Sequence, residues 1–310
     1  MQTRNFVQWS MRSGGYQACG PTLDQLPTGA YLCMTDCYGA PLLQPKTLKL
    51  DDLIDFPGSL SSTILKEIEK FWTRGAQFRK YGFLHRRGYL LYGKQGGGKS
   101  SLIHQVVAKV VQQGSVAFFC QSPHALIQCV EQFREVEPDR PIVCIFEDID
   151  ATIEYHGESA LLQWLDGNHQ VDKAVNIAST NYPEKLDRRI ISRPRRFDRI
   201  LRIDAPDAAL RDAYFARKVP ELADAERARW VEVTSGLQFA ALAELVISVC
   251  CLEHDLEEAV GVLRKLDEHN PSSEEFFPTE APTNEQQHED EEYEEYEEEI
   301  AARNGMAPVH

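Results

Sequence analysis

The sequence of 310 residues has no run of about 20 apolar residues and no pair of cysteines with the spacing Cys-x-x-Cys. A membrane-spanning helix needs ~20 such residues, so we expect none. Structural zinc sites commonly use Cys-x-x-Cys pairs, so we expect no zinc site either. The first 15 residues lack the apolar stretch of a secretory signal peptide.

The eight cysteines are scattered along the chain rather than grouped. They are Cys19, Cys33, Cys37, Cys120, Cys129, Cys144, Cys250 and Cys251. Several fall in stretches that we predict to be strands or helices, where a free cysteine behaves as a small apolar residue. This usage favours a reduced, cytoplasmic setting.

Negative charge is concentrated near the end of the sequence. Residues 271–310 contain thirteen acidic residues against one basic residue, Arg303, so they carry −12 of the net charge of −15. Residues 1–270 carry the remaining −3. This near-neutral part shows no basic, aromatic-rich patch, which argues against a protein that binds nucleic-acid backbones strongly.

A glycine-rich stretch, YGKQGGGKSS at residues 92–101, matches the pattern G-x-x-x-x-G-K-[ST]. Such a loop surrounds phosphates with backbone N–H groups, its lysine neutralises phosphate charge, and its hydroxyl residue ligates Mg²⁺. We expect Ser100 to be that magnesium ligand. The expected nucleotide-binding residues are Gly93, Lys94, Gln95, Gly96, Gly97, Gly98, Lys99, Ser100 and Ser101.

The flanking residues provide the context that such a loop needs. Residues 88–93, GYLLYG, are typical of a buried strand. Residues 99–113 carry apolar side chains at helical spacing, and Gly114 follows at a position that suits the end of a helix. A helix that begins at the loop adds its dipole to phosphate binding. The alternative is a flexible glycine-rich turn.

Two carboxylates follow another apolar stretch, PIVCIF at residues 141–146. They are Glu147 and Asp148. In a nucleotide hydrolase, one carboxylate of such a pair holds Mg²⁺, directly or through water, and the other orients the attacking water. The alternative is a solvated acidic turn.

Three more polar residues are candidates for the same chemistry. Asn181 ends an apolar stretch and could contact the γ-phosphate or position a water molecule. Arg193 and Arg196 follow it, and arginines in such sites stabilise transition-state charge, often from a neighbouring subunit. The alternative is a basic turn paired with Asp187 and Asp198.

The pattern of apolar residues predicts alternating strands and helices after the loop. The expected strands are residues 115–120, 141–150, 174–181 and 198–206, and the expected helices are residues 123–137 and 158–167. Such alternation predicts an α/β fold with a parallel sheet, helices on both faces, and ligands at the carboxyl ends of the strands. Before the loop, we expect an irregular segment at 1–27, two strands within 29–50 and a helix within 59–82.

Four parts of the chain follow from these patterns. We expect an N-terminal segment with a β-hairpin at 1–50, an αβα domain at 51–206, a small helical domain at 207–268 and an acidic tail at 269–310. The tail is expected to be disordered, because its polar residues bury too little apolar surface to offset the entropy of ordering.

In combination, these motifs resemble an AAA ATPase. In family order they are DDLIDFPG (51–58), KYGFLHRRGYLLYG (80–93), the Walker A loop, CIFEDID (144–150) as Walker B, and STNYPEKLDRRIISRPRRFDR (179–199), which resembles the second region of homology. The likeness extends over residues 51–266. It is greatest to the branch of the mitochondrial Rieske-protein translocase and to bacteriophage AAA proteins, for which the cytoplasm would be that of the host.

The resemblance implies several further properties. It implies a P-loop three-layer αβα sandwich followed by a small all-α lid, ATP and Mg²⁺ as cofactors, and a homo-oligomeric ring, typically a hexamer. By analogy, Asn181 is the sensor residue, and Arg193 and Arg196 are the arginine fingers. The branch order Glu-Asp assigns Glu147 to the metal and Asp148 to water activation.

The chain departs from the family pattern in three places. Arg195 stands where a glycine is usual. Residues 234–245, TSGLQFAALAEL, lack the usual Ser-Gly-Ala-Asp of the lid. Residues 118–143 form a short segment and contain no aromatic–hydrophobic–glycine pore loop, the loop that threading unfoldases use.

Three functions are therefore compared. The first is a ring-forming ATP hydrolase that remodels or moves a macromolecule, with a protein as the expected substrate. The second is a slowly hydrolysing, nucleotide-gated scaffold, and the third is a DNA-acting motor or helicase loader. The tail segment HEDEEYEEYEEE (288–299) is either a solvated segment or an arm for a basic partner, with Tyr293 and Tyr296 as apolar anchors.

Overall fold

The computed structural model describes residues 8–12, 15–20, 22–48, 60–166, 169–191, 193 and 195–268. The motif expected at residues 51–58 and the acidic tail at 269–310 lie outside these residues. Among the described helices, none is long and apolar enough to cross a membrane.

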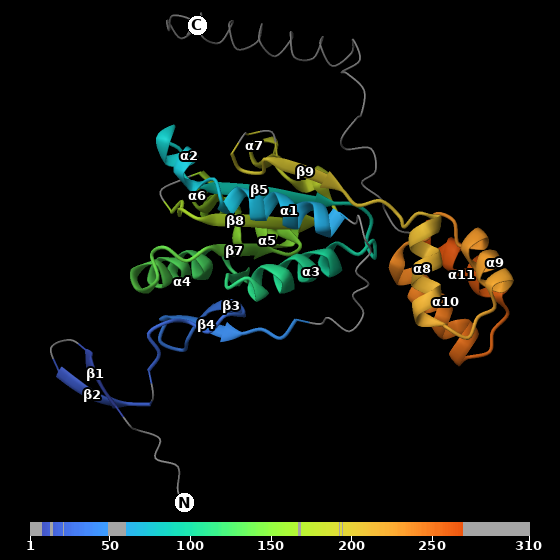
Figure 1. The fold of residues 1–310 in the computed structure, drawn as a ribbon, viewed down its shortest axis with the longest axis horizontal. Helices are drawn as coiled ribbons and strands as arrows, with labels where there is room; N and C mark the ends of the chain where they lie inside the picture. The colour runs from blue at the N-terminus through green and yellow to red at the C-terminus, as the bar shows by residue number, and fades with distance from the viewer. Residues whose placement is uncertain are drawn as a thin grey trace, which may run out of the picture. The chain divides into compact units, whose positions relative to one another are not determined.

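A sheet of seven strands forms the centre of the α/β part of the chain (Figure 1). Its order is β4 (Pro41–Pro45), β3 (Ala30–Thr35), β6 (Val116–Cys120), β7 (Ile142–Phe146), β8 (Ala174–Thr180), β5 (Arg86–Tyr92) and β9 (Arg199–Arg202). All neighbours pair in parallel except β3 and β4, which are antiparallel. The expected α/β class with a parallel sheet is confirmed, with one antiparallel strand at an edge.

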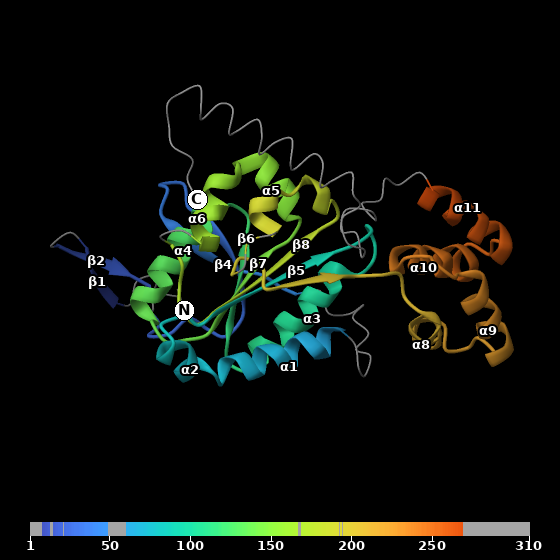
Figure 2. The same ribbon diagram turned by 90° about the horizontal axis from the view of Figure 1, so that it is seen from above.

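Helices cover both faces of this sheet (Figure 2). Helices α1 (Leu60–Trp72) and α3 (Lys99–Gln112) lie on one face, and α5 (Ile149–His156) and α6 (Glu158–Asp166) lie on the other. Helix α4 (Pro123–Val136) packs against α6, β3 and β6. The central strands are buried on both faces, which explains their continuous apolar sequences.

The side chains of successive residues in a central strand point to opposite faces of the sheet. In β7, Val143 and Ile145 belong to the cluster of buried side chains that includes those of α1 and α3. On β8, buried Asn176 accepts a hydrogen bond from the indole Nε1 of buried Trp164 in α6, at 3.1 Å. This bond satisfies two polar groups that burial would otherwise penalise.

The N-terminal part contains more regular structure than the sequence predicts. Strands β1 (Gln8–Arg12) and β2 (Gly15–Cys19) form an antiparallel pair, so the expectation of an irregular segment at 1–27 is wrong there. β1 does alternate polar and apolar residues, QWSMR, but each of the two strands is only 5 residues long, so the signal in the sequence is short. The expected hairpin within 29–50 is confirmed as β3 and β4, and β3 also pairs with β6, which joins the hairpin to the main sheet.

The expected helix at 59–82 is divided in two, since α1 ends at Trp72 and α2 (Gly75–Lys80) begins after a short turn.

A group of helices follows the sheet in the chain. They are α8 (Ala208–Lys218), α9 (Asp224–Val233), α10 (Phe239–Val246), a π-helical turn (Ile247–Cys251) and α11 (Leu256–Glu268). These helices share a cluster of buried apolar side chains around Phe215 and Trp230. Asp207 caps α8 by accepting a hydrogen bond from the Leu210 backbone N–H at 2.8 Å.

Candidate nucleotide site

The glycine loop connects β5 to α3, as predicted, and two of its glycines are required by close contacts. Gly93 has φ +151°, and a Cβ there would lie 2.3 Å from the carbonyl oxygen of Ile203. Gly96 has φ +77°, and a Cβ there would lie 2.8 Å from the Cβ of Ala240 in α10. The Ala240 backbone N–H also donates a hydrogen bond to the Gly96 carbonyl at 3.2 Å. The loop is therefore in direct contact with the helical region.

Lys99 is the first residue of α3, and its side chain folds back into the loop. Its Nζ donates hydrogen bonds to the carbonyl oxygens of Gly93, at 2.7 Å, and Lys94, at 2.8 Å. Burial lowers the pKa of Lys99 to about 8, against the opposing effect of Asp148 and Asp150. A buried ammonium held by two carbonyls is positioned to neutralise a phosphate.

Asp148 and Asn181 meet at the carboxyl ends of neighbouring strands. The Asn181 Nδ2 group donates a hydrogen bond to Oδ1 of Asp148 at 3.2 Å. Asp148 has φ +46°, in the left-handed region, and forms the N-cap of α5. Next to it, Asp150 accepts a hydrogen bond from the hydroxyl of Thr180 at 2.6 Å. These bonds join β8 to the first turn of α5.

Glu147 has a different environment from Asp148. Its Oε1 lies 3.7 Å from the Nε2 atom of His104 in α3, and both side chains are only partly exposed. Asp148 lines the cavity beside the phosphate loop, whereas Glu147 is not among the residues that line it. Burial lowers the pKa of His104, and the nearby Glu147 partly opposes this effect.

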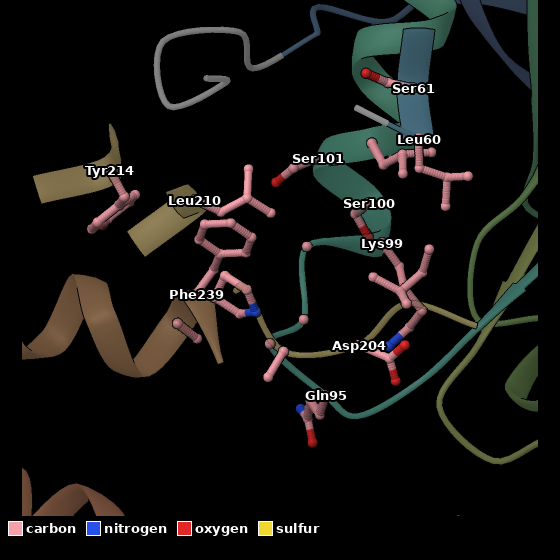
Figure 3. A pocket seen from close by; sticks show the side chains of 18 of the residues that line it. Leu60, Ser61, Gln95, Lys99, Ser100, Ser101, Asp204, Leu210, Tyr214 and Phe239 are labelled. Carbon is pink, nitrogen blue, oxygen red and sulfur yellow. The ribbon is translucent and has the colours of Figure 1, made fainter. Parts of the chain in front are cut away.

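A cavity of about 870 Å³ lies beside the phosphate loop. Gly96–Leu102 line it together with Asp148 and Asn181, so the predicted loop, acid and sensor residues face one space. Figure 3 shows Leu210, Tyr214 and Phe239 of the helical region across the cavity from the start of α3. One side of the cavity is therefore polar and the other is apolar.

The two candidate arginines differ sharply in exposure. The side chain of Arg193 is 67% exposed, and its Nη1 lies 3.2 Å from Oδ2 of Asp166. The side chain of Arg196 is only 3% exposed, pairs with the same Asp166 oxygen at 2.6 Å and donates a hydrogen bond to the Arg189 carbonyl. Neither arginine lines the cavity of its own chain.

Arg195 occupies a conformation that explains why a glycine is usual at this position. Its φ is +75°, in the left-handed region, where a side chain is disfavoured. The guanidinium group lies over the ring of Phe83, with its central carbon 5.4 Å from the ring centroid. This contact contributes to the stability of a conformation that glycine would adopt at lower cost.

The sequence patterns did not identify the apolar side of the cavity or the ion pair of Arg202 with Asp204. Among the missed residues are Leu60, Arg202, Asp204, Leu210, Tyr214, Lys218 and Phe239. The spacing of Leu210, Tyr214 and Lys218 does show that they share one helix face. Nothing in that spacing identifies the face that meets a ligand.

Comparison with known proteins agrees with the geometry. Residues 89–205 match the model of the "ATPase family associated with various cellular activities (AAA)". The chain is 28% identical over 207 residues to the ATP-dependent zinc metalloprotease FtsH of Acidobacterium capsulatum, covering 59% of this chain and 32% of the relative. It is 25% identical over 228 residues to FtsH of Marinobacter nauticus, covering 66% and 35%.

A third relative, from Arabidopsis thaliana, is named "Probable inactive ATP-dependent zinc metalloprotease FTSHI 2, chloroplastic". It is 30% identical over 207 residues, covering 59% of this chain and 23% of the relative. The chain thus spans about a third or less of the length of these proteins, and the likeness is to their AAA modules. Residues 89–205 are therefore an AAA ATPase domain, homologous to the AAA domains of FtsH proteins.

Proposed function

We propose that this protein binds ATP with Mg²⁺ and hydrolyses it in a ring of identical subunits, to remodel or move a protein substrate. One observation supports this most directly: Lys99, Ser100, Asp148 and Asn181 surround one cavity at the carboxyl edge of a parallel sheet. Ligands of α/β sheets bind at that edge. In this proposal, residues 207–268 act as the lid of the site.

The cavity fits a nucleotide in size and in the distribution of polarity. Its volume of about 870 Å³ lies within the ~300–1,000 Å³ of typical ligand sites. The loop N–H groups and Lys99 suit the phosphates, whereas Leu210, Tyr214 and Phe239 provide an apolar side for an aromatic base.

The donor set also fits Mg²⁺. Among the described residues, no three His, Cys, Asp or Glu side chains form a cluster that could hold a metal ion. Magnesium in nucleotide sites needs no such cluster, because one or two protein oxygens suffice beside the phosphates and water. Ser100, which lines the cavity, would provide one oxygen directly, and Glu147, which does not line it, would act on the ion through a water molecule. The ion would neutralise phosphate charge.

Asp148 and Asn181 are the proposed hydrolytic pair. A carboxylate within hydrogen-bond reach of a water molecule can accept its proton during attack on the γ-phosphate. The Asn181 amide holds one oxygen of Asp148, which leaves the other oxygen for the water. The amide is itself in the cavity and so could also contact the γ-phosphate.

Arg193 is the better candidate for a residue that acts on the next subunit. Its exposed guanidinium can reach a neighbour, whereas Arg196 is buried within its own chain. We therefore propose that Arg193 stabilises transition-state charge in the neighbouring site. Arg196 would position this segment through Asp166, which binds both arginines.

Replacing Lys99 with alanine tests the proposed site. The variant should lose ATP binding, measured with a fluorescent ATP analogue, together with ATP hydrolysis. Lys109→Ala, ten residues further along α3, is the matched control and should retain both. Undiminished turnover in Lys99→Ala would overturn the proposed phosphate site.

A scaffold function is the second candidate, and the connection between β6 and α4 favours it. Only Gln121 and Ser122 separate the two elements, so no pore loop is present there. Turnover measured with an unfolded protein, with DNA and with neither distinguishes the candidates. Stimulation by the unfolded protein supports remodelling, stimulation by DNA supports a DNA motor, and slow turnover unaffected by either supports a scaffold.

A further inference from the structure

Two segments that contain no acidic residue come together at one surface. Residues 73–87 contain five basic residues, and residues 188–197 contain another five. The backbone at Gly88 is in close contact with Arg196 and Phe197, and Arg195 lies over Phe83. The sequence-based expectation of no basic, aromatic-rich patch is therefore wrong, because the two segments are about 100 residues apart in the chain.

We call Arg79, Lys80, Tyr81, Phe83 and Arg195 the basic–aromatic surface. Tyr81 is 67% exposed and Phe83 is 55% exposed, and the two rings are only two residues apart in the chain. The Lys80 Nζ lies 5.5 Å from the centroid of the Tyr81 ring, and Arg195 has the same relation to Phe83 at 5.4 Å. Each of the two exposed rings thus has a cation over its face.

Among the described residues, several neighbouring arginines are paired with carboxylates, whereas the basic residues of the surface are not. Arg87 pairs with Asp198, Arg189 with Asp187 and Arg193 with Asp166. In the part of the chain that the structure describes, no carboxylate forms an ion pair with Arg79, Lys80 or Arg195. Three positive charges therefore remain available beside two exposed rings.

We propose that the basic–aromatic surface is the docking site for the acidic tail segment of this same protein, residues 288–299. That segment, HEDEEYEEYEEE, contains nine carboxylates together with Tyr293 and Tyr296. Carboxylates suit the two arginines and the lysine, and the tyrosine rings suit Tyr81 and Phe83. The two partners are thus opposite in charge, and both contain two aromatic residues.

The covalent connection favours the tail over any free acidic partner. The last described helix ends at Glu268, and 19 residues separate it from His288. Such a linker can span up to roughly 60 Å, so the tail can reach distant parts of its own chain or of a neighbour. A tethered segment acts at an effective concentration in the millimolar range. Nucleic acid is less favoured, because residues 1–270 carry a net charge of −3.

Photo-cross-linking in the full chain tests this proposal. A photoreactive phenylalanine analogue is placed at Tyr293, and cross-linked peptides are identified by mass spectrometry. We expect cross-links to residues 79–84 and to Arg195. They should weaken strongly between ~0.05 M and ~0.5 M salt, because screening shortens the range of exposed charges to a few ångströms.

Charge reversal provides the matched comparison. Lys80→Glu with Arg195→Glu should reduce the cross-link yield by about tenfold. Lys66→Glu with Arg217→Glu, two exposed residues away from the surface, changes the net charge equally and should leave the yield unchanged. Replacing the nine tail carboxylates with Gln or Asn should repeat the loss without altering the folded part.

Three results would overturn the proposal. The first is cross-links that fall elsewhere on the chain, and the second is equal losses in both double variants. The third is that single-stranded DNA binds to the basic–aromatic surface and Tyr293 forms no cross-link to it. In that case the DNA binding would be lost in Lys80→Glu/Arg195→Glu. That last result would make the surface a nucleic-acid site.

Discussion

The Asn181 side-chain amide donates a hydrogen bond to Oδ1 of Asp148 at 3.2 Å, although 33 residues separate the two in sequence. They meet because β7 and β8 are parallel neighbours and both residues follow the carboxyl ends of their strands. The bond fixes the Asp148 carboxylate at the edge of the cavity. A fixed carboxylate is what a general base for water attack requires.

Replacing Asp148 with asparagine should preserve ATP binding and slow hydrolysis by about 10²–10⁴-fold. The change keeps the shape of the side chain and removes the proton acceptor. Glu147→Gln should instead weaken nucleotide binding in the presence of Mg²⁺ and leave metal-free binding unchanged. Single-turnover hydrolysis and titration with a fluorescent ATP analogue measure the two effects. Tight ATP binding without hydrolysis in Glu147→Gln would reverse the roles of the two acids.

The strand, glycine-rich turn and helix around residues 93–99 could be predicted from the sequence because their determinants are local. Gly93, Gly98 and Lys99 lie within seven residues, and their spacing alone requires a tight turn before a helix. The same holds for the strand that precedes Glu147, which is apolar throughout because both of its faces are buried. Chemistry contained in one short segment is visible before any tertiary structure is known.

Burial of Arg196 could not be predicted in this way. Arg193 and Arg196 look equivalent in sequence, and their difference depends on Asp166, which lies about 30 residues earlier. The pairing of β3 with β6 is likewise set by contacts across more than 80 residues. Apolar periodicity identifies a helix face, but the element that covers this face depends on long-range packing.

ATP binding without Mg²⁺ should weaken above pH 8. Burial lowers the pKa of Lys99 to about 8, so before ATP binds the ammonium is charged below this pH and loses its proton above it. Phosphate favours the charged form, so the apparent affinity should be constant below pH 8 and fall by up to about tenfold per pH unit above it. Titrations in EDTA at pH 7, 8 and 9 measure this. Lys99→Arg stays charged throughout and is the control, and a flat profile in the unmodified protein would contradict the prediction.

The two arginines should respond differently to alanine. Arg193→Ala should leave the free energy of unfolding nearly unchanged and reduce turnover by roughly 10³–10⁵-fold, as loss of an arginine finger does. Arg196→Ala leaves Asp166 without its buried partner and should lower the free energy of unfolding by about 3 kcal/mol. Urea denaturation and steady-state turnover separate these effects.

Mixing subunits tests whether Arg193 acts in the neighbouring site. Inactive Arg193→Ala chains and inactive Lys99→Ala chains should recover part of the activity when combined, since a mixed ring contains some sites with an intact lysine and an intact neighbouring arginine. Sizing under assay conditions gives the oligomeric state. Full activity in isolated monomers would contradict an arginine supplied by a neighbour.

Arg195→Gly should stabilise the folded protein, although it removes a cation from the basic–aromatic surface. A residue with a side chain at φ +75° costs about 1–2 kcal/mol relative to glycine, and the lost contact with Phe83 returns about 0.5–1 kcal/mol of that gain. The added chain entropy of glycine reduces the gain further, so we expect an increase of no more than about 1 kcal/mol in the free energy of unfolding. Arg195→Ala, which loses the same contact and keeps the strain, is the control and should destabilise. Both variants lose the contact with Phe83, so this contact cannot explain a difference between them. If Arg195→Gly were less stable than Arg195→Ala, the left-handed conformation at this position would be contradicted.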